Sequence, residues 1–148
     1  MSVEDSLTVR DTISRYGRCI DDRDWAGLVS ILADRIRLDF TPLWGGEPEE
    51  LAGTDLVARW REMSERLDAT QHLITGVLPA IDGDEATAVA NLVAVHRRVN
   101  LTGDSLWTVG GTYRFGLRRA AGRWAIESLA LRVAWVDGNQ AVITGPPR

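Results

Sequence analysis

The chain of 148 residues has no lysine, one cysteine and two histidines. Because an enzymatic Schiff base forms on a lysine amine, the absence of lysine excludes that mechanism. The single cysteine, Cys19, cannot form an internal disulfide, and no cluster of cysteines and histidines has the spacing of a metal site. We therefore expect neither a disulfide nor a bound metal.

Long apolar runs and clustered positive charge are missing as well. No apolar stretch approaches the roughly 20 residues of a membrane span, and the N-terminal "MSVEDSLTVRDT" is polar where a signal peptide is apolar. The formal net charge is −4, and the arginines are spread among acidic residues, which leaves no basic surface for nucleic acid. We expect a cytoplasmic protein with no membrane or nucleic-acid partner.

The length corresponds to one domain, residues 1–148, large enough for a core and a cavity. Ser2 stands three positions before an acidic residue, as in a capping box, and opens a helix that runs to about Ile20 with Tyr16 on its apolar face. Asp24 caps a second, short helix, Trp25 to Ala33. These two helices are expected to form a hairpin.

A short strand, a loop and a third helix follow. Residues 35–40 alternate as a strand does, and residues 41–50 contain two prolines and two glycines, which makes this loop a candidate lid. "TDLVARWREMSERL" is amphipathic and begins a helix at Thr54 or Asp55.

The second half of the chain predicts four long strands joined by short turns: 70–81, 86–99, 106–119 and 123–136. Together with the helices, these strands predict an α+β fold, a curved, mostly antiparallel sheet wrapped around helices on one face. Four glycines stand where a bent sheet requires bulges: Gly76, Gly110, Gly111 and Gly116.

The strand 86–99 has two apolar faces, one with Ala90 and Leu92 and the other with Val93 and Val95. Helices can cover one face, and a second copy of the chain is the most economical cover for the other. We therefore expect a homo-oligomer, a dimer or a trimer. Light scattering at micromolar concentration tests this prediction, and a monomeric mass would contradict it.

Both histidines fall in neighbouring predicted strands. His72 lies in "TQHLITG" and His96 lies late in the next strand. In a hairpin closed by "DGDE", residues whose numbers add to about 167 or 168 face each other, so the two histidines are directly or nearly paired. A slip of one residue would place them on opposite faces of the sheet. Asp21, at the end of the first helix, is the candidate carboxylate for this group.

A carboxylate bonded to one imidazole nitrogen fixes the tautomer and leaves the other nitrogen free to accept a proton. Asp21 and His72 would form that pair. The Tyr16 phenol or a protonated His96 would then stabilise the negative charge that develops when a proton beside a carbonyl is removed. Enolisation followed by loss of a leaving group is the chemistry that these groups suit.

Structural interpretations of the same residues remain open. Both histidines are also explained as core residues with satisfied hydrogen bonds, Asp21 as a cap of the helix hairpin, and Tyr16 as a core aromatic. Most of the six tryptophans belong to the core, and Trp44 in the loop is the best candidate to line a pocket for a flat apolar ligand.

Four stretches carry a family resemblance: "IDDRDW" at 20–25, "RIRLDF" at 35–40, "TQHLITG" at 70–76 and "GRWAIESLALRVAW" at 122–135. In order and spacing they are similar to the nuclear transport factor 2-like superfamily, in the SnoaL-like branch that includes scytalone dehydratase and bile-acid dehydratase. The resemblance covers nearly the whole chain. It implies a cone of curved sheet and three helices around an apolar pocket, and no cofactor.

The resemblance also implies roles for individual residues. His72 matches the dehydratase base, Asp21 its carboxylate partner and His96 a second histidine of the pocket. Tyr16 matches the tyrosine of the bile-acid enzyme. These four are the candidate catalytic residues.

Three departures concern substrate binding. Ile20 and Phe40 stand where scytalone dehydratase has two tyrosines that hold the substrate carbonyl, and Tyr113 stands where it has an asparagine. With Trp44, these residues are the candidate substrate-binding residues, and scytalone is not the expected substrate. We expect a dehydratase or isomerase that acts on a cyclic or polycyclic apolar carbonyl compound, such as a polyketide or a steroid-like molecule. The alternatives are a polyketide cyclase, a non-catalytic module that binds a small apolar ligand, or an assembly domain with a vestigial cavity.

Overall fold

The computed structural model describes residues 2–99 and 101–147. In chain order its elements are α1 (Val3–Asp21), α2 (Trp25–Ser30), β1 (Leu32–Asp39), α3 (Thr41–Trp44), β2 (Glu49–Ala52), α4 (Gly53–Glu65), β3 (Ala69–Asp82), β4 (Glu85–Arg97), β5 (Leu106–Ala120), β6 (Arg123–Gly138) and α5 (Ala141–Thr144). The strands form one sheet in the order β2-β1-β6-β5-β4-β3.

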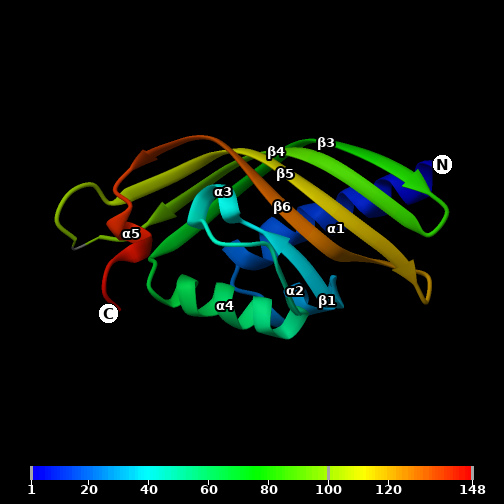
Figure 1. Cartoon of the computed structure of the whole chain (residues 1–148), viewed down its shortest axis with the longest axis horizontal. Coiled ribbons are helices and arrows are strands. Elements are labelled where there is room, and N and C mark those ends of the chain that lie inside the picture. Colours follow the sequence, from blue (N-terminus) through cyan, green and yellow to red (C-terminus); the bar gives the residue numbers. More distant parts are fainter. Residues whose placement is uncertain (1, 100, 148) are drawn as a thin grey trace.

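The sheet arches over α1, α2 and α4 (Figure 1). The β1–β6 pair is parallel and the other neighbouring pairs are antiparallel. The predicted α+β class, with a curved mixed sheet and three helices on its concave side, is therefore confirmed.

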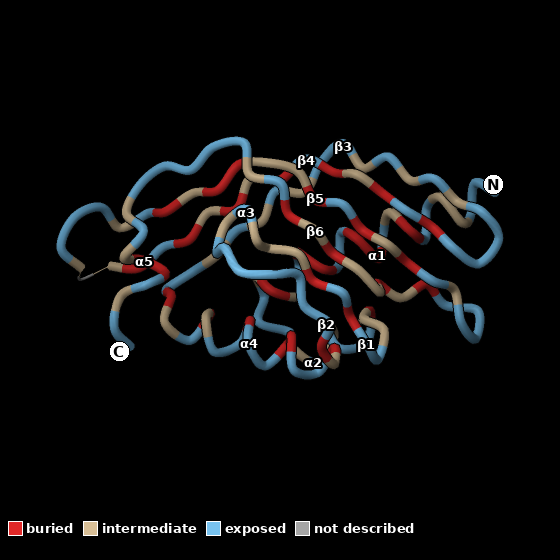
Figure 2. The backbone as a smooth tube through the Cα atoms, in the orientation of Figure 1, coloured by how far each residue is buried: buried red, intermediate tan, exposed pale blue. Residues whose placement is uncertain are grey.

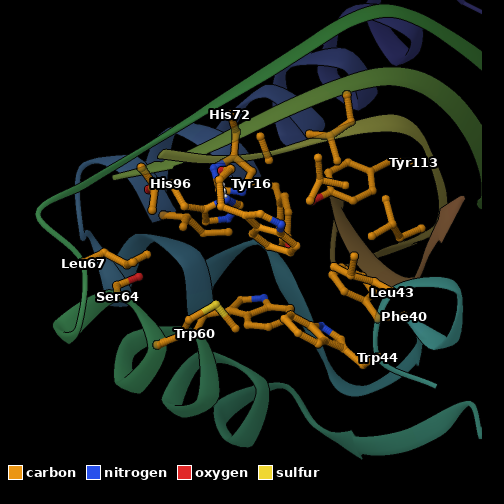
Figure 3. Close-up of a pocket in the computed structure, with 18 residues that line it drawn as sticks. Tyr16, Phe40, Leu43, Trp44, Trp60, Ser64, Leu67, His72, His96 and Tyr113 are labelled. Carbon is orange, nitrogen blue, oxygen red and sulfur yellow. Dashed lines mark hydrogen bonds between the residues drawn. The ribbon is translucent and has the colours of Figure 1, made fainter. Parts of the chain in front are cut away.

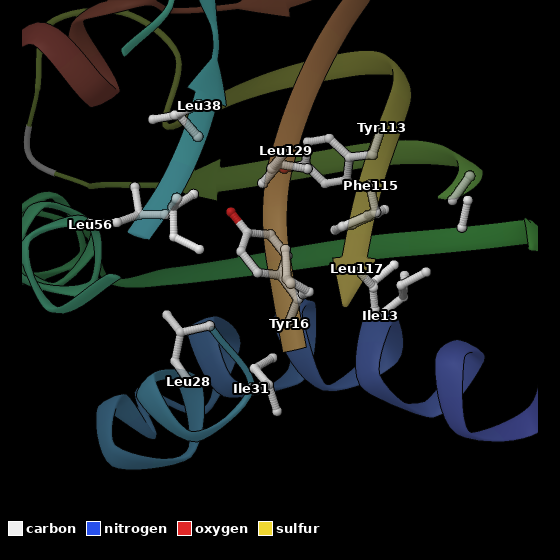
Figure 4. Packing of buried hydrophobic residues seen from close by; sticks show 14 of the residues in the cluster. Ile13, Tyr16, Leu28, Ile31, Leu38, Leu56, Tyr113, Phe115, Leu117 and Leu129 are labelled. Atoms are coloured by element: carbon white, nitrogen blue, oxygen red, sulfur yellow. The ribbon is translucent and has the colours of Figure 1, made fainter. Parts of the chain in front are cut away.

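The helix hairpin forms for the local reasons that its sequence indicates. The Ser2 hydroxyl accepts the backbone N–H of Asp5 at 2.9 Å, and the Asp24 carboxylate accepts the backbone N–H of Gly27 at 2.9 Å. Each bond satisfies a backbone donor that the first turn of a helix leaves free. The buried face of α1 includes Ile13 and Tyr16, which pack against β5 and β6 side chains (Figure 4).

Most predicted boundaries shift by one to three residues: the first strand is Leu32–Asp39, the third helix begins at Gly53, and the strand predicted at 86–99 ends at Arg97. Two segments differ more. The second helix ends at Ser30 and not at Ala33, because Leu32 already pairs with Ile126 as the first residue of β1. The loop 41–50 is not free of regular structure: it contains the single turn of α3 and the start of β2, which pairs with β1. Only the segment between these two elements stays irregular.

A β-bulge in β3 decides which face the histidines occupy. Next to the turn Ile81 pairs with Ala86, and this pairing, if continued, would place His72 opposite Val95 and leave His96 on the other face. The register shifts between residues 75 and 78, after which His72 pairs with Ala94. Both imidazoles therefore lie on the concave face of the sheet.

The bulge is stabilised by its backbone and by α1. Gly76 has φ +61°, a conformation that glycine adopts without steric cost. The Arg10 guanidinium donates to the carbonyl oxygen of Val77 at 2.6 Å, which gives a partner to a carbonyl group next to the interrupted strand pairing.

Gly76→Ala is expected to lower the free energy of unfolding by about 1 to 2 kcal/mol, because a Cβ atom disfavours the left-handed backbone. Thr75→Ala, one residue earlier on the exposed face, is the control and should stay within about 0.5 kcal/mol. Denaturant titration measures both, and equal stability of the two variants would mean that the bulge does not require glycine.

Glycines also mark the two register shifts between β5 and β6, at Gly110/Gly111 and at Gly116/Leu117. A Cβ atom on Gly111 would collide with the carbonyl oxygen of Arg132. The four glycines that the sequence places at bulges are thus found at the bends of the sheet.

The buried residues lie between the sheet and the helices (Figure 2). On the outer face of the sheet, Val89, Val93 and Val95 are half-buried, and Leu78 is 71% exposed. A second copy of the chain on this face stays a prediction. None of the helices in the described ranges combines the length and the apolar character that crossing a membrane requires.

Candidate active site

Asp21 and His72 are in direct contact, although 51 positions separate them in the chain. Asp21 is the last residue of α1 and His72 lies in β3. The Asp21 Oδ1 lies 2.7 Å from the His72 Nδ1, and Oδ2 accepts the backbone N–H of His72 at 2.7 Å. The Thr70 hydroxyl donates to Oδ1 at 2.9 Å. Three hydrogen bonds thus hold one carboxylate against one strand.

These hydrogen bonds keep Asp21 ionised. Burial by itself raises the pKa of Asp21, but the hydrogen bonds and the charge of His72 outweigh it and lower that pKa below its ordinary value. A carboxylate accepts hydrogen bonds only, so the His72 Nδ1 carries a proton. In a neutral ring the His72 Nε2 therefore has the free lone pair that a general base needs.

The close approach of α1 to β3 depends on a small residue. A Cβ atom on Gly17 would lie 3.0 Å from the Ile74 Cδ1 and 3.2 Å from the His72 Cβ. After the helix, Arg23 donates to the carbonyl oxygens of Ser64 at 2.9 Å and of Leu67 at 2.7 Å. The end of α1 is therefore fixed to both β3 and the end of α4.

His96 faces the same space as His72. The two ring centroids lie 6.2 Å apart, and the His96 Nδ1 lies 3.1 Å from the carbonyl oxygen of Trp107. Because a carbonyl only accepts, the His96 Nδ1 is the donor and its Nε2 is an acceptor. Burial and the neighbouring His72 lower the pKa of His96 to about 4, so the ring is neutral at neutral pH.

One sequence-based expectation is therefore wrong. A protonated His96 was one of two groups expected to stabilise the negative charge on a substrate oxygen. The neutral ring, with its proton donated to Trp107, offers that oxygen a lone pair and no proton. The Tyr16 hydroxyl, the other expected group, stays the candidate donor.

Tyr16 and Tyr113 form a buried aromatic pair with ring centroids 6.0 Å apart, at right angles to each other. Burial raises the pKa of the Tyr16 hydroxyl well above its ordinary value of 10, and the neighbouring Trp60 and Tyr113 side chains lower it by a smaller amount. Burial likewise raises the pKa of Tyr113. Both hydroxyls stay protonated at neutral pH.

These side chains surround one pocket between α1, α4 and the sheet (Figure 3). Asp21 lies behind His72, and the other seven predicted site residues line the pocket: Tyr16, Ile20, Phe40, Trp44, His72, His96 and Tyr113. The rest of the lining is largely apolar and includes neither a carboxylate nor an arginine.

The free space in this pocket is limited by aromatic rings. It amounts to about 590 Å³ with the open mouth included, but the centre of a water-sized molecule can move through only about 60 Å³ of it. Phe40 packs on Trp60 at 5.4 Å between ring centroids, and the 42%-exposed Trp44 packs on Trp107 at 6.0 Å. These rings limit the free space beside the histidines.

Among the residues of the site that were not predicted from the sequence, three offer polar groups next to the candidate catalytic residues or in the pocket: Thr70, Trp60 and Trp107. Thr70 had a signal, because residues two apart on a strand share a face and place it beside His72. Trp60 lies on the buried face of α4 and has the pattern of a core residue. The Trp107 carbonyl, which orients His96, has no side-chain signal at all.

Thr70→Val removes one of the three hydrogen bonds to Asp21 and keeps the shape of the side chain. We expect kcat to fall about 10-fold with KM unchanged, because the loss of one hydrogen bond costs about 1.4 kcal/mol, which corresponds to a factor of ten in rate. Thr75→Val, on the opposite face of β3, is the matched control. A kcat equal to that of the control would show that Thr70 does not orient the carboxylate.

Within residues 2–99 and 101–147, no three histidine, cysteine, aspartate or glutamate side chains come together in a way that could hold a metal ion.

The chain belongs to the SnoaL-like domain family, whose model matches residues 1–130. The resemblance inferred from the four sequence stretches is thereby confirmed. Among curated proteins, none matches this chain.

Solved structures share the whole fold. The Kfla4162 protein from Kribbella flavida is 26% identical, with 96% of this chain and 98% of that chain covered and a TM-score of 0.90. A candidate scytalone dehydratase from Novosphingobium aromaticivorans is 14% identical, with 93% and 89% covered and a TM-score of 0.80. The hexachlorocyclohexane dehydrochlorinase LinA-type3 from Novosphingobium barchaimii is 17% identical, with 98% and 97% covered and a TM-score of 0.74. At these identities the last two show a common fold.

Proposed function

We propose that this protein is a cofactor-independent lyase or isomerase that removes a proton beside the carbonyl of an uncharged, cyclic or polycyclic apolar substrate. The observation that carries the proposal is the Asp21 carboxylate 2.7 Å from the His72 Nδ1, with the His72 ring at the wall of an apolar pocket. This arrangement leaves the Nε2 free to act as the base.

The steps follow from the protonation states. The His72 Nε2 takes the proton, and the electron pair of the broken C–H bond moves toward the carbonyl, whose oxygen gains negative charge. The Tyr16 hydroxyl donates a hydrogen bond to that oxygen. The ionised Asp21 stabilises the imidazolium that forms.

The reaction ends in one of two ways. In a dehydration, the electron pair returns, a carbon–carbon double bond forms, and the hydroxyl on the next carbon leaves as water with the proton from His72. In an isomerisation, His72 returns the proton to another carbon. The lone pair of the His96 Nε2 is suited to accept a hydrogen bond from a substrate hydroxyl.

Two further observations support this proposal. Burying a charged substrate group without a partner is costly, and the lining of the pocket includes neither a carboxylate nor an arginine that could pair with such a group, which favours an uncharged substrate. Two proteins of the same fold carry names that describe eliminations, a dehydratase and a dehydrochlorinase.

The second candidate is a module that binds a small apolar ligand without converting it. The largely apolar lining of the pocket, with few polar groups besides the histidines, is also what such a module requires. In that case the histidines would only form hydrogen bonds to the ligand.

The experiment needs no knowledge of the natural substrate. The wild-type protein and His72→Gln are incubated with 2-tetralone in deuterated buffer, and deuterium uptake beside the carbonyl is followed by mass spectrometry. In parallel, 3-hydroxycyclohexanone is supplied, whose dehydration to cyclohexenone is followed by ultraviolet absorption. We expect the wild type to accelerate exchange above the buffer rate and His72→Gln to lose the acceleration.

The two candidates give different outcomes. Exchange without dehydration identifies proton transfer of the isomerase type, and both together identify a dehydratase. Saturable binding of 2-tetralone without exchange, with the same affinity in His72→Gln, would contradict catalysis and support the binding module.

A further inference from the structure

Three polar side-chain atoms within the described part of the chain are buried without a hydrogen-bond partner: Trp60 Nε1, Arg98 Nη1 and Trp124 Nε1. Such atoms are rare in native proteins, and each requires a physical reason. Of the three residues, Trp60 is the one whose side chain lines the pocket with the two histidines. Its indole N–H is therefore an unused donor inside the candidate active site.

Trp60 is linked to Tyr16 through two other aromatic rings of the pocket. Its ring packs on Phe40, which in turn lies 6.2 Å from Tyr113, and Tyr113 packs on Tyr16. Trp60 comes from α4 and lies across the pocket from His72 and His96 (Figure 3). The pocket thus has the two imidazoles on the sheet and the unpaired indole N–H on the helix opposite them, with the Tyr16 and Tyr113 hydroxyls as further donors in its lining.

We propose that the indole N–H of Trp60 makes Tyr16 a stronger hydrogen-bond donor toward the carbonyl oxygen of the substrate, so that Trp60 is a positioning residue of this site. The inference rests on the proposed function and adds to it. It also fixes how that substrate lies in the pocket, with its carbonyl oxygen at the end that faces Tyr16.

Trp60 acts on the pKa of Tyr16 in the direction that the proposal requires, because it lowers that pKa and so favours a stronger donor. Burial raises the pKa of Tyr16, and among its neighbours the Trp60 N–H gives the larger opposing effect, followed by Tyr113. When Tyr16 donates to an oxygen that becomes negative, the Tyr16 oxygen itself gains negative charge. A nearby N–H is attracted to that charge, and hydrogen bonds of this kind often tighten only when substrate is bound.

The influence of the Trp60 N–H and the Tyr16 hydroxyl on each other is tested first without any ligand. In protein labelled with ¹⁵N, the six tryptophans give six indole N–H signals. Trp60→Phe assigns the signal of Trp60, and if that variant does not fold, phenylalanine variants of the other tryptophans assign it by elimination. We expect Tyr16→Phe to move the Trp60 signal upfield and to leave the Trp124 signal in place.

The role toward substrate is tested with two probes of the same shape, cyclohexanone and methylenecyclohexane, of which only the first has an acceptor oxygen. We expect cyclohexanone to show a lowered carbonyl stretching frequency when bound, and Trp60→Phe to weaken its binding about 3- to 10-fold relative to methylenecyclohexane. Trp124→Phe is the matched control, because Trp124 is equally buried (8% exposed) with an equally unpaired N–H.

Each outcome decides the proposal. A Trp60 signal that does not respond to Tyr16→Phe, a carbonyl frequency unchanged between wild type and Trp60→Phe, or no saturable binding of cyclohexanone would overturn it. None of these readouts requires turnover, so they can be repeated on His72→Gln. A positive result with no proton exchange would preserve the role of Trp60 and reject the catalytic function.

Discussion

Asp21→Asn is expected to lower kcat by about 10² to 10⁴ while the fold persists. The size of this effect comes from the tautomer of His72. In the wild type Oδ2 accepts the His72 backbone N–H, and Oδ1 accepts both the His72 Nδ1–H and the Thr70 hydroxyl.

Asparagine cannot satisfy this set of donors. If its single oxygen accepts the backbone N–H of His72, its amide N–H₂ faces the His72 Nδ1 and donates to it. The ring then carries its proton on Nε2, the atom that should remove a proton from the substrate. The base is lost although every heavy atom stays in place.

The measurement is the rate of deuterium uptake by 2-tetralone at saturating concentration. Asp22→Asn is the control, because Asp22 is the next residue, exposed, and paired with Arg18 at the surface. We expect the control to keep the wild-type kcat. Equal rates for both variants would mean that Asp21 is only a cap of the helix hairpin.

Acidification from pH 7 to pH 4 is expected to lower the free energy of unfolding by about 3 kcal/mol through His96 alone. Burial and the neighbouring His72 lower the pKa of His96 from 6.5 to about 4, against the opposing effects of the Trp107 carbonyl and Asp21. Below pH 6.5 the unfolded chain therefore binds a proton that the folded chain does not. The unfolded state gains stability until pH 4, where folded His96 is protonated as well.

Asp21 changes the free energy of unfolding at a lower pH than His96 does. Its pKa is lowered in the folded protein, so its contribution is present above the unfolded pKa and is lost only as the pH falls below about 4. Between pH 6.5 and pH 4 the loss of stability assigned to His96 is therefore separate from that of Asp21.

The comparison is between wild type and His96→Gln, each unfolded by denaturant at several values of pH. We expect the wild type to lose about 3 kcal/mol more than the variant between pH 7 and pH 4. Parallel pH profiles would show that His96 titrates normally, and would restore the protonated ring as a candidate partner for the substrate oxygen.

The face of the sheet on which His72 and His96 lie was only partly predictable from the sequence. The "DGDE" turn and the alternation of apolar residues predict the β3–β4 hairpin, and the glycine at position 76 indicates a bulge. Alternation cannot say whether the register before or after that bulge holds at His72, because a one-residue shift exchanges the two faces. The packing of α1, with Arg10 donating to the Val77 carbonyl, stabilises the register beyond the bulge, in which His72 pairs with Ala94.

Three of the candidate catalytic residues were predictable because their signals are in side chains. Asp21, His72 and Tyr16 are residue types with recognisable chemistry, in segments that resemble a family. Trp60 and the Trp107 carbonyl were not predictable, because a buried tryptophan has the same pattern in a core as in a pocket, and a backbone carbonyl is present at every residue.

The sequence by itself determined the order of the long strands, their boundaries to within two residues, the N-terminal cap of each helix in the hairpin, and the family, because these depend on residues close to each other along the chain. Only the tertiary structure decided that His96 is neutral, with its free lone pair on Nε2, and that aromatic rings leave little free space beside it. Burial and distances between segments far apart in the chain set these properties, and no local pattern contains them.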